Sequence, residues 1–113
     1  MAKETFERLN SFDKFKYPSN TLDDYYDLLH QLMEALSLKE GIKFQGDNAH
    51  KELIDFVSKI ISLPEKDRLL LQEIRFYRNK ISYEGFFIKR IYIERNQNNL
   101  ERLISLFENK IIL

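Results

Sequence analysis

One stretch of the chain, RFYRNKISY, combines side chains that could grip a phosphate group. Arg75 and Arg78 lie three residues apart, and Asn79, Ser82 and Tyr83 follow within the same stretch. At about 100° per residue on a helix, Arg75, Arg78 and Ser82 share one flank. A guanidinium group is a planar donor that can form paired hydrogen bonds to a phosphate. We therefore expect these three side chains to bind a phosphate-bearing ligand.

The charge distribution around this stretch is uneven, although the whole chain is formally neutral. Lys plus Arg and Asp plus Glu each number 18, which argues against nucleic-acid binding over the whole surface. The stretch from residue 75 to residue 95 nevertheless has six basic residues and two acidic ones. They are Arg75, Arg78, Lys80, Lys89, Arg90 and Arg95 against Glu84 and Glu94. Such a local basic surface attracts a phosphate or an acidic partner, and a solvated helix face is the alternative.

The remaining residues offer little other chemistry. His50 stands in the first turn of an expected helix, where a capping or exposed role is typical. His30 is expected to face solvent, because Tyr26, Leu29 and Met33 mark the buried side of its helix. Two separated histidines without any cysteine do not make a closed metal site. We therefore expect neither a metal ion nor another cofactor.

We expect helices alone to position these residues, because apolar residues recur with helical spacing along the whole chain. We expect a short first helix over residues 4–15, ended by Tyr17-Pro18. A second helix follows, capped by one of residues 19–21, and stops at Gly41. Asp47 or Asn48 is expected to cap the third helix.

The pattern of residues in the second half of the chain predicts two further helices. Ser62-Leu63-Pro64-Glu65 has the pattern of a capping box with proline in the first turn, which indicates the start of the fourth helix. This helix should end near Gly85, and the last helix should follow Phe86-Phe87. The short connections predict an all-α fold, an antiparallel up-and-down bundle of about five helices forming a single domain over residues 1–113.

Composition is consistent with a folded, water-soluble domain. Hydrophobic residues make up 43% and charged residues 32% of the chain, which disfavours disorder. No apolar run approaches the roughly 18 residues that a membrane span requires. The first residues, MAKETFERLN, lack the apolar core of a signal peptide. We expect no membrane association and a cytoplasmic location.

The fourth helix is apolar on two sides. Leu70, Ile74, Tyr77 and Ile81 form one stripe, which we expect to face the core. A second strip, on roughly the opposite side, consists of Leu69, Phe76 and Tyr83. A helix that is apolar on two sides must be covered on both. The simplest cover for the second strip is another copy of the chain, so we expect a homodimer.

Arg78-Asn79 followed by Tyr83 resembles the R-N-x-x-x-H signature of the HEPN superfamily. The layout upstream is similar as well: a tyrosine-rich helix ending in Leu-Lys-Glu-Gly, a loop, a helix led by His50, and then the signature helix. The resemblance implies a homodimeric helical bundle whose signature helices face one another across a cleft. Many members are metal-independent ribonucleases, frequently toxins of toxin–antitoxin pairs. Others bind RNA or nucleotides without catalysis or act beside MNT-type nucleotidyltransferases.

The resemblance also implies catalytic roles for Arg78, Asn79 and Tyr83. Arg78 would grip the scissile phosphate, and Asn79 would support it. Tyr83, however, stands where the nuclease members have histidine. A phenol with a pKa of about 10 is a poor base at neutral pH, whereas imidazole titrates near neutrality. This departure favours binding over cleavage.

We therefore expect a HEPN-like dimeric module that binds RNA or a nucleotide along the flank formed by Arg75 and Arg78. It would act with a protein partner such as an MNT-type nucleotidyltransferase. One alternative is an active endoribonuclease in which Arg78 stabilises the phosphorane while Tyr83 or His50 assists. The other is a structural interaction domain whose cationic flank pairs with its own acidic helix.

Overall fold

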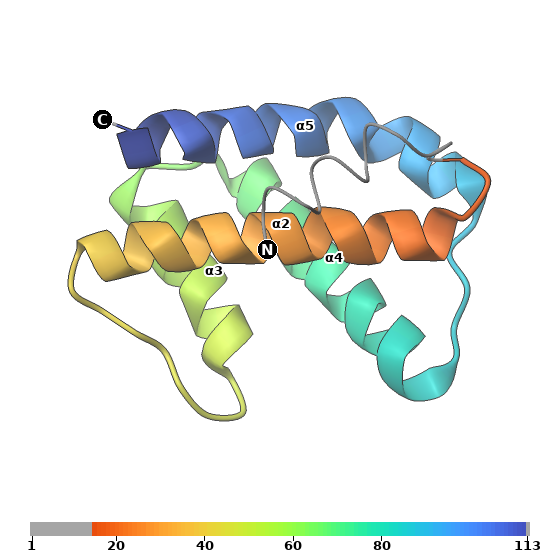
Figure 1. The fold of residues 1–113 in the computed structure, drawn as a ribbon, viewed down its shortest axis with the longest axis horizontal. Helices are drawn as coiled ribbons and strands as arrows, with labels where there is room; N and C mark the ends of the chain where they lie inside the picture. The colour runs from red at the N-terminus through yellow and green to blue at the C-terminus, as the bar shows by residue number, and fades with distance from the viewer. Residues whose placement is uncertain (1–14, 113) are drawn as a thin grey trace.

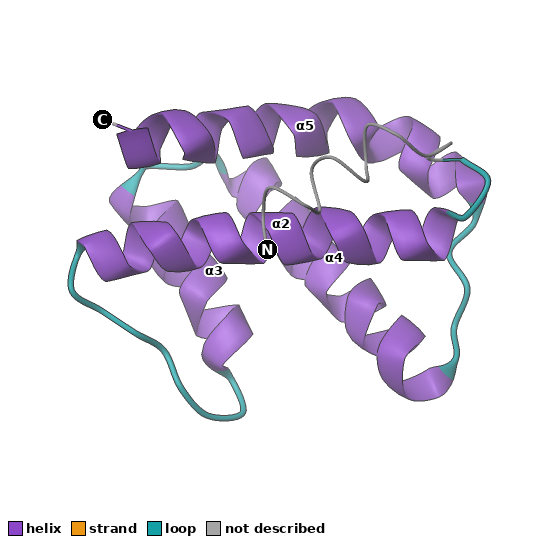
Figure 2. Ribbon diagram, viewed as in Figure 1, coloured by secondary structure: helices purple, strands orange, loops and turns teal. Residues whose placement is uncertain are grey.

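A computed structural model describes residues 15–112, and four helices account for most of them (Figures 1 and 2). They are α2 (Pro18–Lys39), α3 (Ala49–Ile60), α4 (Glu65–Glu84) and α5 (Arg90–Ile112). No strand occurs among the described residues, so the all-α prediction is confirmed. The short first helix expected over residues 4–15 lies outside the described range, except for its last residue.

Helix α2 is the centre of the arrangement and packs against α3, α4 and α5. In Figure 1, α2 and α5 lie side by side and run in the same direction, while α3 and α4 slant across behind them, with their lower ends farther apart than their upper ends. The expected up-and-down order is therefore wrong for α2 and α5. Ser19 Oγ accepts a hydrogen bond from the backbone N–H of Ile88 at 2.9 Å. This bond ties the approach to α5 to the start of α2, so both helices set out from the same end.

The core is built largely from one face of α2. The fully buried side chains of α2 include Leu22, Tyr25, Tyr26, Leu28, Leu29 and Met33. Val57 of α3, Ile74 of α4 and Phe107 of α5 are buried against the same core. Each fully buried side chain of this size contributes roughly 1.5–3 kcal/mol to stability. In α4 the buried apolar positions are Leu71 and Ile74, whereas the expected Leu70 and its stripe partners Tyr77 and Ile81 are only partly buried.

The turn between α3 and α4 differs from the sequence expectation. Ser62 does not form a capping box, because it has φ 54° and lies outside α4, which begins at Glu65 after Pro64. Ser62 instead ends α3 in the left-handed conformation, and the N–H of Leu63 donates to the carbonyl of Ser58 at 2.8 Å. This is the pattern with which helices commonly terminate.

Other helix ends were predicted with mixed success. Gly41 (φ 77°) follows the end of α2 and Gly85 (φ 66°) follows the end of α4, as expected. Helix α2 starts at Pro18, earlier than the expected cap at residues 19–21, because proline is well suited to the first turn. Asn48 stands at the N-cap of α3, although its side chain makes no capping hydrogen bond.

Candidate functional site

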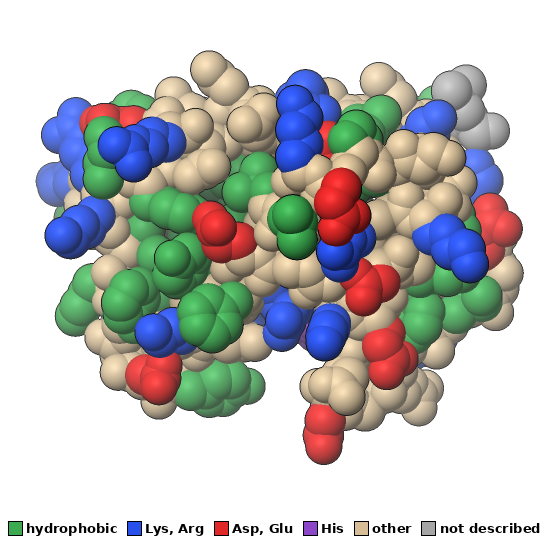
Figure 3. Space-filling view, turned by 180° about the vertical axis from the view of Figure 1, so that it is seen from behind, with side chains coloured by type: hydrophobic (Ala, Val, Ile, Leu, Met, Phe, Trp, Pro, Cys, Tyr) green, Lys and Arg blue, Asp and Glu red, His purple; other side chains and the backbone are tan. Residues whose placement is uncertain are grey.

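Arg78 of α4 lies beside the middle of α2, in the region where α3 and α4 diverge. Figure 3 shows a recess between the splayed ends of these helices, with Lys or Arg side chains at its head. Tyr26 and His30 reach this region from α2, His50 from the first turn of α3, and Arg75 and Arg78 from α4. We call these five residues the histidine–arginine notch.

Arg78 lies half-buried beside α2. Its Nη2 is 3.4 Å from Asp27 Oδ1, and its Cζ is 5.9 Å from the centroid of the Tyr26 ring. Among the described residues, its Nε is buried and has no hydrogen-bond partner. A buried donor without an acceptor costs about 1–3 kcal/mol. Arg78 therefore has a spare hydrogen-bond donor and only a long contact to a carboxylate.

The surroundings of Arg78 contain both signs of charge. Asp23 Oδ1 is also buried without a hydrogen-bond partner among the described residues. Burial raises the pKa of Asp23, and the nearby Arg78 partly offsets that effect. Arg75 donates through Nε to Gln72 Oε1 at 2.8 Å, a neutral partner that leaves its charge uncompensated by this bond.

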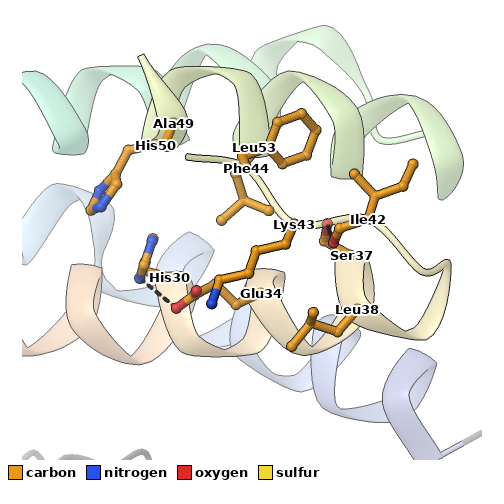
Figure 4. A pocket seen from close by; sticks show the side chains of 10 residues that line it. All are labelled: His30, Glu34, Ser37, Leu38, Ile42, Lys43, Phe44, Ala49, His50 and Leu53. Atoms are coloured by element: carbon orange, nitrogen blue, oxygen red, sulfur yellow. Dashed lines mark hydrogen bonds and ion pairs between the residues drawn. The ribbon is translucent and has the colours of Figure 1, made fainter. Parts of the chain in front are cut away.

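The two histidines of the chain stack on each other inside the notch. The ring centroids of His30 and His50 are 4.0 Å apart, with 22° between the ring planes. His50 Nδ1 shares a hydrogen bond of 2.9 Å with the hydroxyl of Tyr26. His30 Nδ1 lies 3.3 Å from Glu34 Oε1, as the dashed line in Figure 4 shows.

Both expectations for the histidines need correction. His30 does not face open solvent, since only 20% of its side chain is exposed. His50 is neither a cap nor exposed, because its ring packs on His30 and Tyr26. The physical reason is the packing of α3, whose buried Leu53 and Val57 hold its first turn against the middle of α2. His30 follows Tyr26 by one helical turn and so shares its face.

Burial determines the titration of these side chains. It lowers the pKa of His30, although the neighbouring Glu34 opposes the shift. It also lowers the pKa of His50, and His30, Arg78 and Arg75 lower that pKa further. Burial raises the pKa of the Tyr26 phenol. At neutral pH both imidazoles are therefore mainly uncharged, and Tyr26 keeps its proton.

A pocket of about 100 Å³ opens beside the histidines, between α2, the loop over residues 40–48 and the start of α3 (Figure 4). Its lining comprises His30, Glu34, Ser37, Leu38, Ile42, Lys43, Phe44, Ala49, His50 and Leu53. This volume corresponds to roughly three water molecules. The pocket is thus large enough for a small polar group.

No protein-family model matches the chain, and no curated protein or solved structure is significantly similar to it. The histidine–arginine notch has to be interpreted from its own geometry. Within residues 15–112, no group of three or more His, Cys, Asp or Glu side chains is arranged to hold a metal ion. No helix in that range is long and apolar enough to cross a membrane.

Other residues expected at the site lie outside the notch. Ser82 is exposed, and Asn79 is half-buried on α4. Tyr83 is 81% exposed and lies about 140° around α4 from Arg78. It belongs instead to the exposed strip with Leu69 and Phe76, which are 53% and 52% exposed. In Figure 3, hydrophobic side chains gather on the side of the molecule where α4 lies, next to Lys and Arg.

The sequence predicts Arg75 and Arg78 as candidate ligand-binding residues, but it does not predict the side chains that α2 and α3 place beside them. One signal was available for His30, because it stands four residues after Tyr26, which was expected to be buried. A position one turn away from a buried residue shares its face of the helix. No comparable signal existed for His50, whose position depends on how α3 crosses α2.

Proposed function

We propose that this chain binds a phosphate-bearing ligand, RNA or a nucleotide, in the histidine–arginine notch. The observation that carries the proposal is the state of Arg78. Its guanidinium group is half-buried, its Nε is buried without a partner among the described residues, and its carboxylate contact is long. A phosphate could bind the part of this side chain that is exposed, 29%, and an arginine fork matches phosphate geometry better than any other side chain does.

The contact between Arg78 and Asp27 does not preclude such a ligand. The side chains of this pair are 29% and 41% exposed, and Nη2 and Oδ1 are 3.4 Å apart. Partly exposed ion pairs typically contribute only about 0–1 kcal/mol, because water screens them. A bidentate phosphate brings more charge and more acceptors than one distant carboxylate oxygen, so it can compete for the guanidinium.

The HEPN resemblance supports two finer proposals about partners. The exposed strip of Leu69, Phe76 and Tyr83 would form a homodimer interface, since three large apolar side chains repeat every two turns along one side of α4. A protein partner such as an MNT-type nucleotidyltransferase would act beside the module. Both partners are expected on the outer side of α4, away from the notch.

A second candidate is a metal-independent endoribonuclease, and the position of His50 favours it. Tyr83 is too exposed and too far around α4 to serve a phosphate held by Arg78. His50 is hydrogen-bonded to the hydroxyl of Tyr26, whose ring centroid is 5.9 Å from Arg78 Cζ. An imidazole near a bound phosphate can act as a general acid or base, which a phenol does poorly at neutral pH.

Binding of a fluorescent ten-nucleotide oligouridylate tests the proposal. The wild-type protein should bind with an affinity that falls steeply with salt concentration, and Arg78→Ala should lose at least roughly tenfold in affinity. The matched control is Arg68→Ala, which removes an arginine of the same helix that pairs with Asp55 and Glu65. This control should bind normally.

Three outcomes are informative. An equal loss of affinity in Arg78→Ala and Arg68→Ala would show that the loss comes from the removed positive charge and not from a specific site at Arg78. Absence of binding by folded wild-type protein, combined with unfolding of Arg78→Ala, would favour the structural role in which Arg78 serves only Asp27 and α2. Denaturing gels of the same mixtures without added metal would reveal cleavage, and cleavage that Arg78→Ala abolishes would favour the endoribonuclease.

A further inference from the structure

We propose that His30 and His50 are ligand-binding residues that hold the anion in their protonated form, so that ligand and proton are taken up together. This inference rests on the proposed function and adds two residues and a pH dependence to it. According to this inference, the protonation of the two imidazoles, and not the arginines alone, decides whether the notch attracts an anion.

The Tyr26 ring links both imidazoles to Arg78. Its centroid is 6.0 Å from that of His30, 5.9 Å from that of His50 and 5.9 Å from Arg78 Cζ. The described contacts engage Nδ1 of each ring, with Tyr26 at His50 and with Glu34 at His30. Nε2 of each ring is therefore the nitrogen left to meet a ligand. Both rings also border the small pocket, which lies beyond them from the arginines and has Lys43 in its lining.

The balance of charge around the rings makes their protonation decisive. Asp27 and Glu34 act on the imidazoles from α2, and Arg75 and Arg78 act on them from α4. These two carboxylates and two guanidinium groups cancel, and the Asp23 carboxyl beside Arg78 can only make the balance more negative. Neutral imidazoles therefore leave the notch without net positive charge from these groups. Lys43 of the loop lines the adjoining pocket and adds one cation there. Each proton on the histidine pair adds one positive charge at the notch itself.

The direction of the linkage follows from the free and bound states. Without ligand, burial and the nearby Arg78 hold both imidazole pKa values below their ordinary value. A bound phosphate places negative charge beside the rings and raises these pKa values. Between the lowered and the raised pKa, the complex holds a proton that the free protein lacks. Two protonated rings 4.0 Å apart repel each other, so we expect the uptake of roughly one proton per ligand.

The affinity of an unlabelled ten-nucleotide oligouridylate with free hydroxyl ends, measured by calorimetry between pH 5.5 and 8, tests this inference. That probe has no group that titrates in the range, and His30 and His50 are the only histidines of the chain. Wild-type affinity should rise as the pH falls, approaching tenfold per pH unit where one proton is linked to binding. The double variant His30→Gln/His50→Gln should bind weakly at all pH values with a flat profile.

Calorimetric titration in two buffers of different ionisation heat counts the protons directly. The expected count is close to one for the wild type near pH 6 and near zero for the double variant. Circular dichroism at each pH establishes that both proteins are folded. A wild-type affinity independent of pH, or the same slope in the double variant, would overturn the inference while leaving phosphate binding intact. If the folded protein binds at no pH, the proposed function itself fails.

Discussion

The imidazole of His30 on α2 stacks on the imidazole of His50 on α3, with 4.0 Å between the ring centroids. This contact joins two helices at the point where the arginines of α4 approach them. It also buries two titratable groups together, and burial lowers the pKa of both. The stack therefore affects the stability of the fold as well as the charge of the notch.

Folding stability should fall as the pH is lowered below the ordinary imidazole pKa of about 6.5. Because the folded protein has lowered pKa values at His30 and His50, the unfolded chain binds more protons in this window. The free energy of unfolding, measured with urea, should drop more between pH 7.5 and 5.5 for the wild type than for His30→Gln/His50→Gln. Equal losses in both proteins would show that other groups dominate.

Tyr26→Phe should destabilise the fold by about 1 kcal/mol, because it removes the hydroxyl that His50 Nδ1 uses while keeping the buried ring. Urea unfolding measures the effect. Tyr17→Phe is the matched control, since Tyr17 is 52% exposed and its hydroxyl should matter little. A variant Tyr26→Phe as stable as the wild type would mean that water replaces the hydroxyl at no cost.

Leu29→Ala should destabilise the protein by about 2–5 kcal/mol, because Leu29 is fully buried at the centre of the core. Leu38→Ala removes the same atoms from the same helix at a position that is 57% exposed, and its effect should stay within about 0.5 kcal/mol. Thermal or urea unfolding of the two variants provides the comparison. Similar effects at both positions would contradict the packing of α2 described above.

Phe76→Glu should weaken self-association roughly tenfold or more if the strip with Leu69 and Tyr83 forms the dimer interface, because it places charge in an apolar contact. Light scattering during gel filtration, over a range of concentrations, gives the mass. Phe87→Glu changes an aromatic residue of the loop after α4 that is more exposed than Phe76, 81% against 52%, and should have no effect. A wild-type mass of one chain at every concentration would rule out this interface.

The helical class of the protein follows from the sequence, as do several helix ends. Apolar spacing marks α2 to α5, and Gly41 and Gly85 mark two ends because they supply the left-handed conformation needed there. Ser62 shows the limit of such local rules. The capping-box pattern is present in the sequence, but in the structure Ser62 ends α3 instead. The two roles require different backbone conformations, so Ser62 can fill only one of them.

The sequence alone also identified Arg75 and Arg78 as candidate ligand groups, because charge and helical spacing are properties of a single segment. Only the tertiary structure decided which side chains surround them. The parallel course of α2 and α5 and the placement of His50 on His30 depend on how whole helices pack. Such packing depends on many weak contacts between segments that are distant in the sequence, so it cannot be predicted from a local pattern of residues.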